Sequence, residues 1–360
     1  MSERSLQEFV HEVSGESHLR VEHDFGDGFV RLRTSEAERR QAAQDIQCSE
    51  NIVLELLRNS RDARASHVFL AVSREGSIRR ITVIDDGDGI PKSMHEHVFE
   101  PRVTSKLDTS HMDAWGLHGR GMALFSIAEN AQKAYVVDSE TGLGCAIRVE
   151  TDVTKLGEKA DQSAFPRFEL TDTGSVNVRG PRNILRTACE FAIEARDSCS
   201  VFVGTAAEIA ATVYSFGNST LSSIDKAFCH DAAQLPLVKR LATAADPNDF
   251  ASIAAGMGLE LSPRTAHRIF SGQIIEAESL IERIEISTPA KGKASGKSPR
   301  SRKAASKVRL QREDVHAMSQ AVRAAYSDIA ERYYLDGDVD PGVRVSGGSI
   351  IVTIPLVEKE

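Results

Sequence analysis

Cysteine is scarce in this chain, and its spacing suits neither a metal site nor a disulfide framework. The 360 residues include five cysteines, and no two of them form a CxxC pair: Cys48, Cys145, Cys189, Cys199 and Cys229. An odd number of widely spaced cysteines argues against a structural zinc site and against a disulfide scaffold. We therefore expect a reducing environment and a cytoplasmic location.

Long apolar runs and an excess of positive charge are also missing. No run of about 18 apolar residues occurs, so we expect no spanning helix and no membrane partner. The opening residues, MSERSLQEFVHEVS, lack the basic and apolar segments of a signal peptide. Because 52 acidic residues outnumber 44 basic ones, giving a net charge of −8, the chain as a whole is not a general polyanion binder. A hydrophobic content of 41% permits a sizeable core, and the length favours two or three domains.

A polar ladder stands out in the segment ELLRNSRDA, residues 55–63. Glu55, Asn59 and Asp62 recur at helical spacing beside an apolar face. We expect one continuous helix from Ser35, a candidate N-cap, to about Ala63. Solvated surface helices carry similar ladders, so the ladder alone does not identify a functional site.

The next motif is VIDDGDGIP, residues 83–91. Its first residues complete a predicted strand, 79–85, which would deliver the Asp85 carboxylate to the edge of a sheet. Gly87 and Gly89 follow at once, and glycine permits tight backbone bends and close approach by a neighbour. This pattern suits a ligand pocket, although a simple turn would have the same composition.

Two further segments complete the series. FEPRVTSKL spans residues 99–107, and GLHGRGMALFSI spans residues 116–127. The glycines of the second segment lead into a predicted helix near 120–131, whose N-terminal N–H groups and positive dipole end would suit phosphate oxygens. The sequence contains no GxxxxGK[ST], which excludes a P-loop.

The order and spacing of these four segments resemble the ATP-binding domain of the GHKL superfamily, which includes gyrase, MutL, histidine kinases and a group of heat-shock chaperones. The resemblance covers about residues 20–150. It implies a Bergerat fold, an α/β sandwich whose mixed, mostly antiparallel sheet carries helices on one face. It also implies ATP and Mg²⁺ as cofactors.

The resemblance assigns roles to individual residues. Glu55 would be the general base that orients the attacking water, Asn59 would hold Mg²⁺, and Asp85 would accept a hydrogen bond from the adenine amino group. Gly87 and Gly89 would shape the adenine pocket, and three glycines would form the lid over the phosphates. The other residues expected at the nucleotide are Asp62, Thr104, Lys106, Gly116, Gly119 and Gly121.

Details of the motifs favour an ATP-hydrolysing member. Thr104, Ser105 and Lys106 match the TSK of MutL, and the lid segment is also MutL-like, whereas Phe-Glu-Pro at 99–101 is typical of histidine kinases. Glu55 stands where histidine kinases usually have Asn, and a carboxylate base suits activation of water. We therefore expect a slow, Mg²⁺-dependent ATPase that acts as a nucleotide-driven conformational switch.

Two alternatives stay open. One is a histidine-kinase-like or serine-kinase-like module that phosphorylates a separate partner, and the other is a module that senses ATP without turnover. His11 lies in a kinase-like setting, but it precedes Asn59 by too few residues for an intervening helical hairpin, so we interpret it as a surface helix residue.

Related ATPases supply a lysine to the γ-phosphate from a second domain. Lys155, Lys159, Lys226 and Lys239 are candidates here, but none lies in a motif. Lys106 is therefore the preferred phosphate-side cation.

We divide the chain into four regions. Residues 1–155 form the ATP-binding domain, and residues 156–287 form a second region that is α/β and then wholly helical. Residues 288–311 form a flexible basic linker, rich in Lys, Arg, Gly, Ser and Ala and devoid of acids between 288 and 309. Residues 312–360 form a C-terminal helix and a β-hairpin.

DNA is a candidate partner on two grounds. Residues 251–272 resemble a helix-turn-helix with Arg264 and Arg268 one turn apart on its second helix. The basic linker, Lys291–Arg309, would bind a phosphate backbone without sequence preference. An ATP-dependent homodimer is a further expectation from the resemblance.

Overall fold

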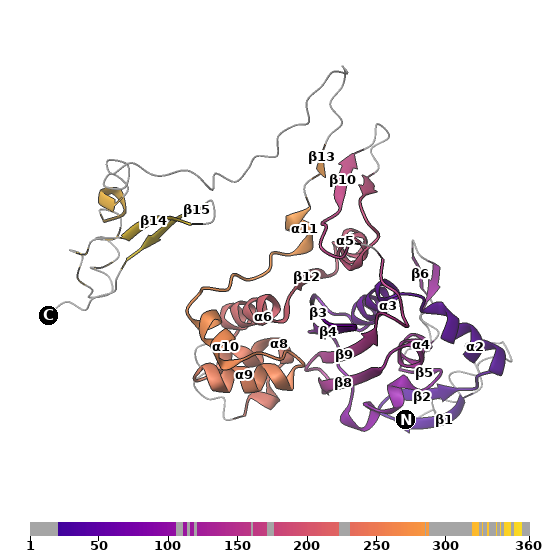
Figure 1. Ribbon diagram of the computed structural model, residues 1–360. Coiled ribbons are helices and arrows are strands. Elements are labelled where there is room, and N and C mark those ends of the chain that lie inside the picture. Colours follow the sequence, from indigo (N-terminus) through magenta and orange to yellow (C-terminus); the bar gives the residue numbers. More distant parts are fainter. Residues whose placement is uncertain are drawn as a thin grey trace, which may run out of the picture. The chain divides into compact units, whose positions relative to one another are not determined.

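The chain folds as two units, residues 1–289 and 290–360. In this computed structural model the described residues of the first unit are 21–105, 111–113, 116–118, 121–159, 161–170, 176–222, 231–284 and 286–287. Those of the second unit lie between 319 and 354, with gaps. Figure 1 shows the helices and strands of both units.

A five-stranded sheet forms the centre of the first unit, in the order β12-β3-β4-β9-β8. All neighbours are antiparallel except β12, which runs parallel to β3. The strands are β3 (His67–Glu75), β4 (Ile78–Asp85), β8 (Lys133–Ser139), β9 (Cys145–Asp152) and β12 (Ser200–Gly204). The expected mixed, mostly antiparallel sheet is therefore present.

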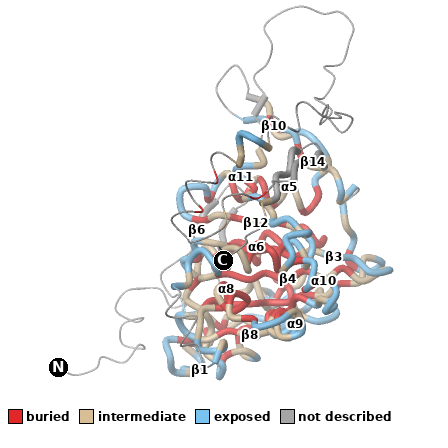
Figure 2. The backbone as a smooth tube through the Cα atoms, turned by 90° about the vertical axis from the view of Figure 1, so that its left-hand side faces the viewer, coloured by how far each residue is buried: buried red, intermediate tan, exposed pale blue. Residues whose placement is uncertain are grey.

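Both faces of this sheet are buried. Val68 and Leu70 of β3 belong to one apolar cluster, whereas Phe69 and Ala71, which alternate with them, belong to another. In the tube of Figure 2 the central strand β4 is accordingly mostly buried (red). Successive side chains of a strand point to opposite faces, so a continuous apolar run requires cover on both sides.

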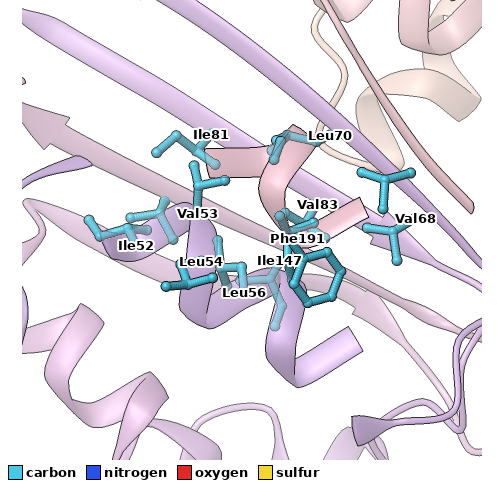
Figure 3. Packing of buried hydrophobic residues seen from close by; sticks show 14 of the residues in the cluster. Ile52, Val53, Leu54, Leu56, Val68, Leu70, Ile81, Val83, Ile147 and Phe191 are labelled. Carbon is cyan, nitrogen blue, oxygen red and sulfur yellow. The ribbon is translucent and has the colours of Figure 1, made fainter. Parts of the chain in front are cut away.

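Helices from the N-terminal region cover the first face, joined by one helix from beyond residue 155. They are α3 (Ser49–Asp62), α4 (Ala123–Asn130) and α5 (Ile184–Glu194), and α2 (Glu36–Asp45) packs against α4. Figure 3 shows Ile52, Val53 and Leu56 of α3 against strand residues and Phe191 of α5. Burying each such side chain contributes roughly 1.5–3 kcal/mol, so this face fixes α3, and with it the polar ladder, on the sheet.

The single helix expected over 35–63 is wrong, because α2 ends at Asp45 and α3 begins at Ser49. Ile46 and Cys48 are buried in extended backbone between them. The Asn51 amide oxygen accepts hydrogen bonds from Gln47 N at 3.2 Å and Cys48 Sγ at 3.1 Å, which stabilise the break. Ser35 is the N-cap of α2, as expected, and forms a capping box with Glu38.

The second region covers the other face of the sheet. Its helices are α6 (Ala206–Thr220), α8 (Leu237–Arg240), α9 (Pro247–Gly256) and α10 (Pro263–Phe270), and their core includes the fully buried Phe250. The helix pair expected at 251–272 is present as α9 and α10, and Ser262 caps α10. Gly258 between them has φ +79°, and its carbonyl accepts hydrogen bonds from Thr82 Oγ1 at 3.2 Å and Arg148 Nη1 at 3.3 Å. The pair is thus anchored on the sheet through its turn.

Smaller elements complete the first unit. The sheet β1-β2-β5 combines Val21–Gly26, Phe29–Leu32 and Val103–Thr104, and the sheet β11-β10-β13 combines Val176–Arg179, Arg167–Leu170 and Ile286–Ser287. β6 (His111–Asp113) pairs with β7 (Gly116–His118). The short helices are η1 (Lys92–Met94), η2 (His97–Phe99), η3 (Ala232–Gln234), η4 (Leu241–Thr243) and α11 (Leu280–Arg283).

The chain on either side of residue 155 shares one core. β12 extends the central sheet beside β3, and α5 packs against α3. The two regions expected at 1–155 and 156–287 therefore lie together within one compact unit. The expected linker, 288–311, lies outside the described residues.

The second unit contains a β-hairpin, β14 (Gly342–Ser346) with β15 (Ser349–Thr353). Residues 319–323 are helical, and Tyr326, Ala330 and Val339 are buried together. Within the described part of either unit, no helix has the length and apolarity needed to cross a membrane.

Candidate functional site

A cavity opens beside the polar face of α3. Strands β4 and β9, the loop after β4 and the start of α4 form its other walls. Its lining residues are Phe29, Glu55, Leu56, Arg58, Asn59, Ser60, Asp62, Ala63, Val83, Asp85, Asp88, Gly89, Ile90, Val98, Val103, Thr104, Ser105, Gly121, Ala123, Leu124, Cys145 and Ile147.

Most of the residues singled out from the sequence meet in this cavity. Seven of them line it: Glu55, Asn59, Asp62, Asp85, Gly89, Thr104 and Gly121. Gly87 lies just behind, where its N–H donates to Asp85 Oδ1 at 3.0 Å. Gly116 is the first residue of β7, and Lys106 and Gly119 lie outside the described residues. Four segments distant in sequence are thus assembled around one space.

Asp85 ends β4 as a buried carboxyl group, 6% exposed. Its Oδ2 accepts a hydrogen bond from Ser60 Oγ at 2.8 Å. Burial raises the pKa of Asp85 to about 6, and the hydrogen bonds from Ser60 and Gly87 N–H limit that rise. A carboxyl group fixed in this way in the cavity wall can accept a hydrogen bond from a planar polar group that enters.

Glu55 and Asn59 line the cavity from α3. Arg58 Nη1 donates to Glu55 Oε1 at 2.5 Å, and the two side chains are 7% and 21% exposed, respectively. The Asn59 amide nitrogen is buried, and among the described residues it has no hydrogen-bond partner. A buried amide NH₂ group without a partner costs free energy, so this donor is suited to an acceptor that the protein does not itself provide, such as a phosphate oxygen.

The glycines after β4 are required by neighbouring backbone. A Cβ on Gly87 would lie 2.7 Å from the Ala63 carbonyl oxygen at the end of α3. Gly89 has φ +74°, and a Cβ there would lie 2.0 Å from the Glu140 carbonyl oxygen. The sequence predicted that these glycines allow a ligand to approach closely. In the structure it is the protein's own backbone that approaches both positions closely.

Asp86, next to Asp85, has a structural role. Its Oδ1 accepts hydrogen bonds from the N–H groups of Ser66 and His67, both at 2.8 Å, and its Oδ2 lies 2.7 Å from His67 Nδ1. Burial alone would raise the pKa of Asp86, but the hydrogen bonds and charge of His67 outweigh burial and lower it. Of these two neighbouring carboxyl residues, Asp85 lines the cavity and Asp86 does not.

Sequence analysis missed several lining residues. Ser60 follows Asn59 directly, and its hydroxyl reaches Asp85 only because β4 passes beside α3. Cys145 lines the cavity because β9 pairs with β4 in a register that places it opposite Asp85. Arg58 could have been found from the sequence, because residues three apart on a helix are neighbours and an arginine three residues after Glu55 can pair with it.

The residues present fit a nucleotide with Mg²⁺. Apolar residues such as Val83, Ile90 and Ile147 supply walls for a planar base, and Asp85 supplies the acceptor. Within the described part of the chain no side chain caps the N-terminus of α4, so its first N–H groups are not used by a cap. Among the described residues no cluster of three or more His, Cys, Asp or Glu could hold a metal alone. Mg²⁺ is commonly held by one or two protein oxygens together with substrate phosphates and water, and the Asn59 amide on the cavity wall contains such an oxygen.

Comparison with known proteins points in the same direction. Residues 45–155 match the family HATPase_c, described as histidine kinase-, DNA gyrase B- and HSP90-like ATPase. The DNA mismatch repair protein MutL of Clostridium beijerinckii is 38% identical over 100 residues, which are 27% of this chain and 15% of the relative. MutL of Lactiplantibacillus plantarum is 37% identical over 135 residues, 36% of this chain and 19% of the relative. MutL of Staphylococcus carnosus is 30% identical over 115 residues, 31% of this chain and 18% of the relative.

These matches concern only the region around the cavity. The chain spans less than a fifth of the length of the three MutL proteins, and the match ends near residue 155. The helices on the second face of the sheet thus lie outside the matched family region.

Proposed function

We propose that this chain, in which residues 45–155 form a MutL-like, ATP-binding domain of the GHKL type, is a slow Mg²⁺-dependent ATPase. Nucleotide binding and hydrolysis would switch its conformation. The observation that carries this proposal is the meeting of Glu55 and Asn59 from α3 with Asp85 from β4 around one cavity. The residues that we propose as base, metal ligand and adenine acceptor therefore border the same cavity.

Each of these residues has a distinct task in the proposed reaction. Asp85 accepts a hydrogen bond from the adenine amino group and so orients the base. Glu55 orients a water molecule and accepts its proton. Asn59 offers a neutral amide oxygen to Mg²⁺, which supplies positive charge to the phosphates when it is bound. Thr104 and Gly121 border the phosphate side, where the lid would close.

The fold supplies a route from the nucleotide to the second region. Val83 and Asp85 line the cavity, and Thr82 on the same strand donates to the Gly258 carbonyl between α9 and α10. α5 packs against α3, which carries Glu55 and Asn59. We infer that a change at the nucleotide alters the packing of the helices beyond residue 155, as a switch requires.

We further propose that the output of the switch is linked to DNA. Arg264 and Arg268 are exposed on α10, where a phosphate backbone could reach them. Mismatch repair is the process named for the MutL relatives, and the basic segment Lys291–Arg309 adds cations without acids. An ATP-dependent homodimer belongs to the same proposal.

The test is phosphate release by the purified chain with Mg-ATP, with and without duplex DNA, comparing wild type with Glu55→Ala. Slow release that is lost in Glu55→Ala while ATP binding is kept would support the ATPase, and acceleration by DNA would support the DNA link. The ATPase proposal would be refuted if the chain binds ATP but releases no phosphate, or releases phosphate equally in wild type and Glu55→Ala. In that case γ-³²P-ATP should be used to look for a phosphorylated partner, as a kinase would produce.

A further inference from the structure

Arg58 is a buried cation in the wall of the candidate site. It follows Glu55 by three residues on α3, and its side chain is only 7% exposed. Its guanidinium donates to the Glu55 carboxylate at 2.5 Å, and both residues line the cavity. A buried arginine is costly unless its charge is compensated. Arg58 is therefore not an ordinary solvated surface arginine.

The charge of the cavity lining is one-sided. Four carboxyl residues line it, Glu55, Asp62, Asp85 and Asp88, and Arg58 is the single Lys or Arg among its described lining residues. A triphosphate entering such a cavity adds several negative charges, which Mg²⁺ compensates only in part. Close unit charges of the same sign repel strongly at the low effective dielectric of a protein interior. A positive charge near the bound phosphates would offset this repulsion, and Arg58 is the described lining residue that carries one.

Resting on the proposed ATPase function, we propose that Arg58 binds the terminal phosphate of ATP and exchanges its ion pair with Glu55 for this contact. Arg58 then supplies from α3 itself the charge that related enzymes take from a second-domain lysine. It distinguishes ATP from ADP, because only the triphosphate reaches it.

The exchange also accounts for the pairing of Arg58 with Glu55. The hydrogen bond from Arg58 occupies Oε1 of the Glu55 carboxylate and so competes with a water molecule for that oxygen. When the guanidinium moves to the phosphate, Glu55 becomes free to orient the attacking water. Guanidinium is suited to this exchange, because its planar fork matches carboxylate and phosphate oxygens alike. The catalytic base is thus released by the group that recognises the substrate.

The test compares binding of Mg-AMPPNP, a slowly hydrolysed ATP analogue, with binding of Mg-ADP by calorimetry. In Arg58→Met the affinity for Mg-AMPPNP should fall about 10- to 100-fold, the range for one charge-assisted contact, while that for Mg-ADP changes less than about 3-fold. ATP turnover should fall as well. Arg58→Lys should restore part of the preference for the triphosphate.

A matched control is Arg186→Met on α5. Arg186 pairs with Glu190 at 2.8 Å, is 16% exposed and does not line the cavity. This substitution removes a helical ion pair of similar burial and should leave the ratio of the two affinities unchanged.

Glu55→Gln provides a second test that keeps Arg58. With its ionic partner neutralised, Arg58 should favour the phosphate more, so the affinity for Mg-AMPPNP should rise relative to that for Mg-ADP. This variant also serves if Arg58→Met fails to fold.

Three results would overturn the proposal. Equal losses for both nucleotides in Arg58→Met would show a general structural role, and faster turnover at an unchanged affinity ratio would show that Arg58 only restrains Glu55. An unchanged ratio in Glu55→Gln would show that no exchange occurs. If the wild-type chain binds neither nucleotide, the proposed ATPase function itself is refuted. If Arg58→Met still prefers Mg-AMPPNP to Mg-ADP as wild type does, only the role of Arg58 is refuted.

Discussion

Replacing Asp85 by Asn should stabilise the protein while weakening its binding of ATP. The carboxyl group is 6% exposed and accepts hydrogen bonds from Ser60 Oγ on one oxygen and Gly87 N–H on the other. An asparagine can keep both, because its oxygen can face Gly87 while its amino group donates to the Ser60 hydroxyl, which also accepts. The substitution therefore removes the buried charge without leaving either neighbour unpaired.

The magnitude can be worked out from the pKa of Asp85, which burial raises from 3.8 to about 6. Between these two pH values the folded protein holds a proton that the unfolded chain has lost, so stability decreases as pH rises through this interval. Above about pH 6 the full penalty applies, roughly 3 kcal/mol. Asp85→Asn should raise the free energy of unfolding by up to this amount at pH 8, and the gain should vanish near pH 4.

Urea unfolding of both proteins at several pH values measures this difference directly, since other groups titrate equally in the two. Nucleotide binding at pH 8 should fall at the same time, because the adenine amino group loses its charged acceptor. A residue retained at a cost in stability for the sake of a ligand behaves in this way. A destabilised Asp85→Asn at pH 8, or a stability difference independent of pH, would refute the reasoning.

Two further predictions concern the supports of the site. Asp86→Asn should cost about 1–3 kcal/mol of stability at pH 7, because Asp86 accepts three hydrogen bonds, including one from the His67 ring. The lowered pKa of Asp86 means that this stabilisation is fully present above pH 3.8 and is lost as pH falls below that value, so denaturation well below pH 3.8 should show a smaller difference from wild type than denaturation at pH 7. Gly89→Ala should unfold the loop, since its Cβ would lie 2.0 Å from the Glu140 carbonyl oxygen, whereas Gly142→Ala, at a similar φ of +77° but with open space, should cost only about 1 kcal/mol. Thermal melting of the two alanine variants tests this, and equal losses would contradict the steric argument.

Local patterns predicted the elements around the cavity well. The predicted strand at 79–85 and the helix carrying Glu55, Asn59 and Asp62 are present, because their apolar periodicity matches the face that each buries. The break between α2 and α3 was missed. It depends on burial of Ile46 and Cys48 and on hydrogen bonds to Asn51, and a propensity pattern does not show tertiary burial.

The extent of the first unit was also beyond the reach of the sequence. A strand pattern at 199–204 is visible, but nothing local states that β12 pairs in parallel with β3, some 130 residues earlier. The apolar character of both faces of β3 was the available hint. Alternate residues such as Val68 and Phe69 require separate cores, and the second core comes from helices beyond residue 155.

The sequence by itself determined the chemical groups of the candidate site. Glu55, Asn59, Asp85 and the glycines lie in short segments whose order and spacing carry the resemblance to GHKL domains, and chemistry of this kind depends on residue type. Only the tertiary structure decided what surrounds those groups. It placed Ser60 against Asp85, left the Asn59 amide nitrogen without a partner among the described residues and paired Arg58 with Glu55. Hydrogen bonds and ion pairs act over a few ångströms, so they depend on which elements pack together. A pattern along the sequence does not give the distance between side chains on different elements.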